Sequence, residues 1–494
     1  MKESMKELSD ATLASLPDVE VPRYDRTALR NGIVHMGVGH FHRSHQALYL
    51  DELMRRGAAT DWAICGAGVR PGDAAVHRAL APQDHLYTLT VKEPDGSRRS
   101  RVIGSLNGYR YAQDDPAGLV AQIADPAIRI VSLTITEGGY GIDPATGEFT
   151  AESPEIRADL AADAPDRTVF GIVLQAMRLR RERGDRGMTV VSCDNIQHNG
   201  RVASAAFLGF AELKDPALAR WMRQHIRFPS SMVDRVTPGT VDADRTYLEA
   251  THGYRDRWPV TCEPFHQWVL EDDFAAGRPP LEDAGVDMVA DVEPYELMKL
   301  RLANGTHQAL CYFGHLLGHR YVHEAVTDPD IRALLLRYID EEAVPTLRPI
   351  AGVDPRAYGR TVIDRFSNPE IQDPLTRICA KTSDRIPTFL LPVVTAQLKR
   401  GGPTRQCAAV VASWARYAEG TDEQGRTIDV VDPRRDTLMA AARKQGSQAT
   451  AFIEDPSVFG DLAQSAQFVQ DYTDALDRIR TKGVRRALGE LAAL

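Results

Sequence analysis

The chain has 494 residues, of which 43% are hydrophobic and 26% charged, and its formal net charge is −9. This length allows two or three domains with large cores, and the composition is that of an ordinary globular protein. The negative charge gives no indication of nucleic-acid or anionic-membrane binding, because such partners favour a basic surface.

The six cysteines are scattered along the chain and form no C-x-x-C pair. This pattern argues for a reducing compartment and against a disulfide scaffold or a thiolate zinc site. The first residues lack an apolar signal region, and no run reaches the roughly 18 apolar residues of a membrane span. We therefore expect a cytoplasmic protein.

Short apolar runs in the first 200 residues predict buried strands, separated by stretches with helical periodicity such as 41–56. The runs cover residues 32–37, 62–69, 101–104, 129–136 and 188–193. Nearly continuous apolar strands that alternate with helices indicate a parallel sheet covered on both faces.

The pattern changes near residue 290, after which helical periodicity dominates. The helical segments are 294–317, 329–344, 387–400, 405–419 and 465–492. The fold class predicted is α/β: a doubly wound Rossmann-type domain over 1–290, followed by an all-helical domain over 291–494.

Gly37 and Gly39 follow the first predicted strand and precede a helix that starts with Phe41, His42 and Arg43. Two glycines let the backbone turn tightly and approach a pyrophosphate at the helix N-terminus. His42 replaces the third glycine of the usual fingerprint, so an ordinary glycine-rich turn fits the pattern equally well.

Asp73 follows the second strand, where an acidic residue usually holds the adenosine ribose of NAD. It lies farther from the glycines than the usual ~20 residues. The neighbouring Arg70 could instead meet the 2′-phosphate of NADP, and a plain loop carboxylate is a further alternative. We favour NAD.

Polar residues end two later strands: Thr134, Thr136 and Glu137 after one, and Asn195 after the other. Ligands of open α/β sheets bind at the carboxyl ends of strands. An amide at that edge can stabilise a developing alkoxide. Simple turns would also explain these residues.

Residues 295–310 set Lys299, Asn304 and His307 into an apolar helical pattern. A buried lysine tends to lose its proton and can then act as a general base. At about 100° per residue, Lys299 and His307 lie about 80° apart, but Lys299 and Asn304 about 140° apart. The side chains of Lys299 and Asn304 could act at one site only if the helix were locally irregular or if they were approached from the wall of a cleft. The alternative is that Lys299 reaches solvent and His307 is a core histidine.

His315, His319 and His323 follow at i, i+4 and i+8. The spacing imitates a metal site, but no H-E-x-x-H motif or cysteine pair accompanies it, so we favour an ordinary helix face and no metal.

Taken together, these residues resemble the polyol-specific long-chain dehydrogenase/reductase family. The resemblance rests on residues 37–46, 132–140, 192–195, 232–238 and 262–265, together with Lys299, Asn304 and His307. It implies metal-independent, NAD-dependent oxidation of a polyol to a ketose, with D-mannitol and D-fructose as the expected pair.

The resemblance also implies roles for individual residues. Lys299 would be the general base, Asn195 and Asn304 the oxyanion hole, and Glu137 and Glu296 gates for proton exchange. The polyol hydroxyls would be bound by His307, Asp234, Arg377 and Arg385. Arg385 stands where relatives more often have lysine, so the resemblance does not determine what the far end of the substrate pocket binds. We expect no nucleic-acid or membrane partner, and a monomer or small homo-oligomer.

Other activities remain open within this family. Arabinitol or sorbitol could be the polyol, and the arginines at 377 and 385 would also suit a fructuronate or tagaturonate reductase. A non-catalytic NAD-binding sensor is disfavoured by the intact lysine and asparagines. Sugar-phosphate oxidation would need a phosphate cradle that the helical segments do not offer.

Overall fold

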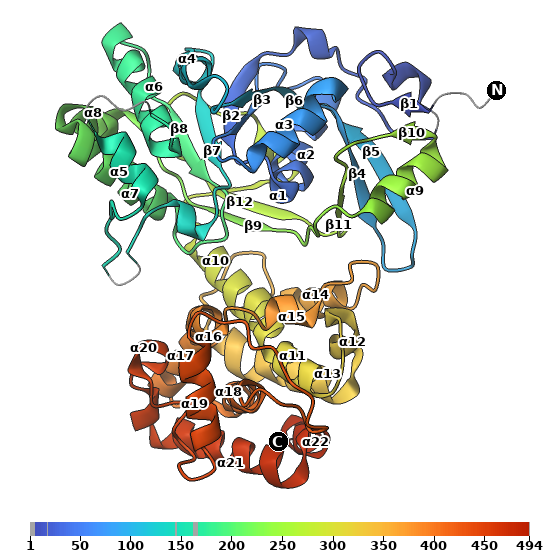
Figure 1. Cartoon of the computed structure of the whole chain (residues 1–494), viewed down its shortest axis with the longest axis vertical. Helices are drawn as coiled ribbons and strands as arrows, with labels where there is room; N and C mark the ends of the chain where they lie inside the picture. The colour runs from blue at the N-terminus through green and yellow to red at the C-terminus, as the bar shows by residue number, and fades with distance from the viewer. Residues whose placement is uncertain (1–4, 17, 144–145, 162–165, 494) are drawn as a thin grey trace. The chain divides into compact units, whose positions relative to one another are not determined.

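The computed structural model describes residues 5–16, 18–143, 146–161 and 166–493. It divides into two compact units (Figure 1). The first comprises residues 1–93 and 97–292, and the second comprises 293–494 together with 94–96.

A five-stranded parallel sheet organises the first unit, in the order β6-β3-β2-β7-β8. Its strands are β2 (Asn31–Met36), β3 (Ala63–Gly68), β6 (Leu106–Tyr111), β7 (Ile130–Leu133) and β8 (Thr189–Ser192). Val34 of β2 pairs with Cys65 of β3 on one side and with Val131 of β7 on the other. The chain therefore builds outward from β2 in both directions, as in a doubly wound fold.

Both faces of this sheet are buried. Helices α4 (Pro116–Ala124), α6 (Val169–Arg183), α7 (Asn199–Lys214) and α8 (Pro216–His225) pack on one face around residues such as Val34 and Val131. On the other face, Ile33 and Ile130 pack against α2 (Gln46–Arg55) and β12 (Gln267–Glu271). Burial on both faces explains why the strands read as continuous apolar runs. The predicted fold class is confirmed.

Two details of the first unit differ from prediction. The run at 101–104 belongs to β5 (Arg98–Ile103), which pairs antiparallel with β4 (Tyr87–Lys92), so β6 takes the third place in the parallel sheet. The predicted helix over 41–56 is two helices, α1 (His40–Ser44) and α2, because the backbone of His45 leaves helical geometry at φ −121° and ψ −89°.

Smaller elements complete this unit. Strands β4 and β5 form a sheet with β11 (Val260–Cys262), and β12 forms one with β9 (Ser231–Asp234) and β13 (Asp287–Val289). The others are β1 (Lys6–Glu7), β10 (Tyr254–Arg255), α3 (Asp73–Leu80), α5 (Pro154–Leu160) and α9 (Asp242–His252).

The second unit is helical. Its catalytic candidates lie on α10 (Glu293–Lys299), the π-helix η6 (Leu300–Asn304) and α11 (Gly305–Leu316). Then follow α12 (Val322–Thr327), α13 (Pro329–Arg337), the π-helix η7 (Tyr338–Ala343), α14 (Pro355–Phe366), α15 (Leu375–Ile378), α16 (Thr382–Phe389) and α17 (Leu391–Arg400). The last are α18 (Arg405–Ala418), α19 (Arg435–Lys444), α20 (Pro456–Phe459), α21 (Ala466–Lys482) and α22 (Val484–Ala493).

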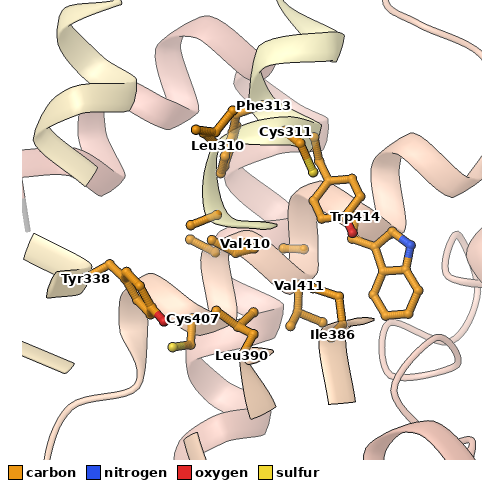
Figure 2. Packing of buried hydrophobic residues seen from close by; sticks show 14 of the residues in the cluster. Leu310, Cys311, Phe313, Tyr338, Ile386, Leu390, Cys407, Val410, Val411 and Trp414 are labelled. Carbon is orange, nitrogen blue, oxygen red and sulfur yellow. The ribbon is translucent and has the colours of Figure 1, made fainter. Parts of the chain in front are cut away.

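Helix α18 forms the centre of this unit's core. Val410, Val411 and Trp414 are fully buried and pack among side chains of α11, α16 and η7 (Figure 2). The N-terminus of α18 is capped from η7, where the buried Glu342 carboxylate accepts hydrogen bonds from the Gln406 and Cys407 amides. Across all described residues, the structure has no helix long and apolar enough to span a membrane.

Candidate active site

The glycine turn after β2 has the geometry that the sequence predicts for a dinucleotide site. Gly37 has φ +93°, and a Cβ placed there would lie 2.2 Å from the Thr134 carbonyl oxygen. Gly39 precedes α1, and a Cβ there would meet only the Gly37 oxygen, at 3.8 Å. Gly37 is therefore required by the protein's own packing, whereas Gly39 leaves its side of the backbone open to a ligand.

A buried polar network holds this turn from behind. The Thr134 hydroxyl donates to the Gly37 carbonyl at 2.6 Å and lies 2.9 Å from the His35 Nε2, while the His35 Nδ1 lies 2.8 Å from the Ser132 hydroxyl. Burial lowers the pKa of His35 to about 3, so the ring stays neutral. Thr134, predicted to bind the cofactor, thus contacts the turn directly. His35 was not predicted, because a lone histidine in a buried strand gives no signal of its partners.

His42 and Arg43 lie in the core beneath the same turn. The His42 ring stacks on His35 with centroids 3.4 Å apart. The Arg43 guanidinium donates to the Gly39 and Trp258 carbonyls and is fully buried. Both residues support the turn through the protein interior. Phe41 is only partly buried and stacks against His45.

Asp73 is the first residue of α3, directly after the β3 loop. Its Oδ2 accepts hydrogen bonds from the Val69 and Arg70 amides, each at 2.9 Å. Among the described residues, no side chain or backbone amide donates a hydrogen bond to Oδ1, so this oxygen is left for a ligand. The Arg70 guanidinium donates instead to the Ile135 carbonyl at 3.2 Å.

The buried Asp194 joins the loops that follow β7 and β8. Its two carboxylate oxygens accept the Ile135 and Thr136 amides, each at 2.9 Å, and one of them also accepts the Tyr140 hydroxyl at 2.8 Å. Thr136 has φ +68°, a left-handed conformation that costs a non-glycine residue about 1–3 kcal/mol. This clamp fixes the loop bearing Thr136 and Glu137 beside Asn195. One feature of the sequence could have revealed this clamp, namely the acid next to Asn195.

The carboxyl edge of the parallel sheet therefore collects many of the predicted residues. Because the five strands run parallel, the Gly37 turn, Asp73, Thr134 and Thr136, and the exposed Asn195 all follow strand ends at that edge. Glu137 is exposed in a single 3₁₀ turn, Glu137–Gly139. Asp234 is the last residue of β9, in the sheet that β9 forms with β12 and β13, and it is buried.

The second unit brings Lys299 and Asn304 onto one side of a helix through the π-helix between them. The Gly305 amide donates to the Leu300 carbonyl, five residues earlier. A turn that closes over five residues rather than four brings residues five apart closer to one face than a regular α-helix does. The predicted local irregularity is thus present. Lys299 is 7% exposed, and Glu296, one turn earlier on α10, is 5% exposed.

The other candidates of the second unit have clear partners. The His307 ring stacks on Phe366 of α14, with centroids 3.7 Å apart and planes inclined by 14°. The Arg377 guanidinium forms a two-point ion pair with Asp373. Arg385 donates to the Arg377 and Ile378 carbonyls, at 2.9 and 3.0 Å, and so caps α15.

The three histidines of the predicted stripe do not share a helix face, because α11 ends at Leu316. His315 packs edge-on against Tyr417, His319 contacts Asp328, and His323 stacks on Tyr321. No group of three or more metal-ligating side chains occurs among the residues that the structure describes.

The first unit by itself has the structural features of a dinucleotide-binding site. The turn has a glycine whose outer side is open, the amides of α1 begin directly after it, and Asp73 keeps one oxygen for a ribose hydroxyl. This combination favours a dinucleotide turn over an ordinary glycine-rich turn.

Comparison with known proteins agrees with this arrangement. Residues 31–283 match the mannitol dehydrogenase Rossmann domain, and residues 291–480 match the mannitol dehydrogenase C-terminal domain. Mannitol 2-dehydrogenases of Neosartorya fischeri and Aspergillus terreus are each 43% identical over 495 residues, and the former match covers 99% of this chain and 98% of the relative.

Two solved structures are similar over the whole chain. The Pseudomonas fluorescens mannitol 2-dehydrogenase, in a ternary complex with NAD and D-mannitol, has a TM-score of 0.87 at 42% identity and 99% coverage of both chains. A substrate-free D-sorbitol dehydrogenase has a TM-score of 0.90 at 37% identity, covering 98% of this chain and 100% of its own.

Proposed function

Because this chain belongs to the mannitol dehydrogenase family, we propose that it oxidises D-mannitol at C2 to D-fructose with NAD, and catalyses the reverse reduction. The observation that carries the proposal is full-length similarity to a mannitol 2-dehydrogenase solved with both NAD and D-mannitol. The turn at Gly37 and Gly39 and the π-helix that aligns Lys299 with Asn304 support the same chemistry.

The first unit would hold the cofactor. The backbone at Gly39 and the first amides of α1 suit the pyrophosphate, and the Asp73 carboxylate suits the adenosine ribose. Asp73 would also disfavour a 2′-phosphate, because two negative charges would face each other. When bound, NAD⁺ supplies the acceptor for the hydride that leaves C2.

The remaining chemistry belongs to side chains of this chain. Lys299, as the neutral amine, takes the proton from the C2 hydroxyl. The amides of Asn195 and Asn304 donate hydrogen bonds to the same oxygen, which stabilises the negative charge that grows there. Glu296 and Glu137 gate the exchange of the proton between Lys299 and solvent.

Further residues select and orient the polyol. His307, whose ring lies flat against Phe366, and Asp234 bind hydroxyl groups of the polyol. Arg377 and Arg385 border the far end of the substrate pocket. Arg377 is paired with Asp373, and Arg385 caps α15. Both guanidinium groups are therefore already engaged within the protein rather than available to a substrate carboxylate. This weighs against a uronate substrate. No step requires a metal.

Sorbitol is the second candidate substrate, since the D-sorbitol dehydrogenase is as similar in structure. An NADH absorbance assay across mannitol, sorbitol, arabinitol, fructose and fructuronate separates these activities. We expect the highest kcat/KM with mannitol and fructose. Much faster reduction of fructuronate than of fructose would refute the proposal.

The role of Lys299 is tested by Lys299→Ala. Removing the proton acceptor should lower kcat by about 10²–10⁴-fold while the fold is retained. Wild-type oxidation should rise with pH as the ammonium gives up its proton, and the variant should lose this inflection and respond to added small amines. An unchanged inflection in the variant would make His307 the candidate base.

A further inference from the structure

The π-helix η6 displaces one backbone hydrogen bond. In an α-helix the Gly305 amide would donate to the Arg301 carbonyl, four residues earlier. Here it donates to the Leu300 carbonyl instead. A partly buried carbonyl that loses its donor destabilises the segment unless another donor replaces it.

The replacement comes from Tyr338, the first residue of the second π-helix, η7. Its hydroxyl donates to the Arg301 carbonyl at 2.6 Å. Tyr338 is fully buried, and Figure 2 shows its ring beside Cys407 in the core of the second unit. Burial raises the pKa of Tyr338 well above its usual value, so the phenol keeps the proton that it donates.

Gly305 makes room for this hydroxyl. A Cβ at position 305 would lie 2.2 Å from the Tyr338 oxygen, and its next nearest neighbour would be the Tyr338 Cζ at 3.2 Å. Any side chain at 305 would therefore drive the phenol away from Arg301. The glycine is needed for close approach, since its own φ of −60° is ordinary for a helix.

We propose that Tyr338 is a positioning residue for catalysis: by replacing the Gly305 amide at the Arg301 carbonyl, it stabilises the π turn that aligns Lys299 with Asn304. This deepens the proposed function and rests on it. If the segment relaxed to α-helical geometry, the two side chains would diverge to about 140° around the axis, and the base and the oxyanion donor would no longer reach one oxygen.

The test is Tyr338→Phe in the full chain, which removes one oxygen and little volume. We expect kcat for mannitol oxidation to fall about 10–100-fold, because misplacing a catalytic group by about 1 Å has a cost of that order. The KM for mannitol and the dissociation constant for NADH should change by less than about threefold, since the lost interaction acts in the transition state.

Tyr472→Phe is the matched control. Tyr472 is also fully buried in the second unit, and its hydroxyl donates to the Gln445 side chain, far along the sequence from η6. Both variants should show a similar small decrease in melting temperature, but only Tyr338→Phe should lose turnover. Equal kcat values for the two variants would overturn the proposal.

A double variant tests the geometry independently. Gly305→Ala alone should lower kcat and melting temperature, because the new methyl displaces the phenol. In the Tyr338→Phe background the clashing oxygen is absent, so adding Gly305→Ala should have a much smaller effect. Fully multiplicative effects on kcat would contradict the proposed contact.

Failure of this inference can be told apart from failure of the proposed function. If Lys299→Ala and Asn304→Ala keep wild-type turnover, the proposed catalytic roles are wrong whatever Tyr338 does. If those variants are inactive and Tyr338→Phe behaves like Tyr472→Phe, only the positioning role is wrong.

Discussion

Replacing the two glycines of the turn by alanine, one at a time, should separate packing from cofactor binding. Gly37→Ala places a methyl group 2.2 Å from the Thr134 carbonyl oxygen, in a backbone with φ +93°. Gly39→Ala places one in open space, in a backbone with φ −91° that alanine adopts readily.

The expected changes in stability have opposite signs. For Gly37→Ala, the left-handed conformation alone costs about 1–3 kcal/mol, and the overlap with Thr134 adds to it. The melting temperature of the cofactor-free protein should fall by roughly 4 °C or more. For Gly39→Ala, the smaller entropy of the unfolded chain should stabilise the protein by about 0.4–1 kcal/mol.

Both variants should nevertheless bind NADH more weakly. The Gly37 methyl distorts the turn, whereas the Gly39 methyl occupies space that a pyrophosphate would need. We expect affinity to fall about 10–100-fold, a loss of about 1.4–2.8 kcal/mol. Fluorescence titration with NADH and thermal unfolding without cofactor measure the two effects. If Gly39→Ala binds NADH as tightly as wild type, the turn does not hold the dinucleotide.

Two further predictions concern single carboxylates. Asp73→Asn keeps an oxygen for the Val69 and Arg70 amides but removes the negative charge. The ratio of NADP to NAD turnover should therefore rise. An unchanged ratio would mean that another residue sets the preference for NAD. Burial raises the pKa of Glu342 from 4.5 to about 7, against the opposing effect of the amides that donate to it. An acid whose pKa is higher in the folded chain loses stability as pH rises between the unfolded and folded values, here by up to about 3 kcal/mol. Glu342→Gln should lack this loss. The difference in melting temperature, variant minus wild type, should therefore increase from pH 5 to pH 8. A difference that does not change with pH would contradict the effect of burial on the pKa of Glu342.

The strands of the parallel sheet could be predicted because burial on both faces leaves a run of apolar residues. The third strand was misassigned for the opposite reason. β6 contains Asn107, Gly108 and Arg110 and lies at the sheet edge, so it has no apolar run, whereas β5 ends in the adjacent apolar residues Val102 and Ile103. The break at His45 was also missed, since helical periodicity continues across it.

For the site, residue types could be predicted but partners could not. Lys299 and Asn304 stand out because polar groups interrupt an apolar helix, and their spacing of five residues already called for either an irregular turn or approach from a cleft wall. The residues that support them carry no local signal. Tyr338 lies 37 positions from Arg301 in the chain, and Phe366 lies still farther from His307, so only the fold brings these pairs together.

The π-helix also constrains the length of the chain at this point. It holds one residue more than an α-helical turn would, so the segment from Leu300 to Asn304 behaves as a local insertion. Deleting one residue there would restore α-helical hydrogen bonding without turning the helix downstream, because the wide turn absorbs its extra residue within the turn itself. Helix α11, whose buried side includes Leu310 and Phe313, would keep the same face toward the core. Insertions and deletions should therefore be tolerated in the surface loops of this unit, whereas one between Lys299 and Gly305 should abolish activity, because it removes the turn that aligns Lys299 with Asn304.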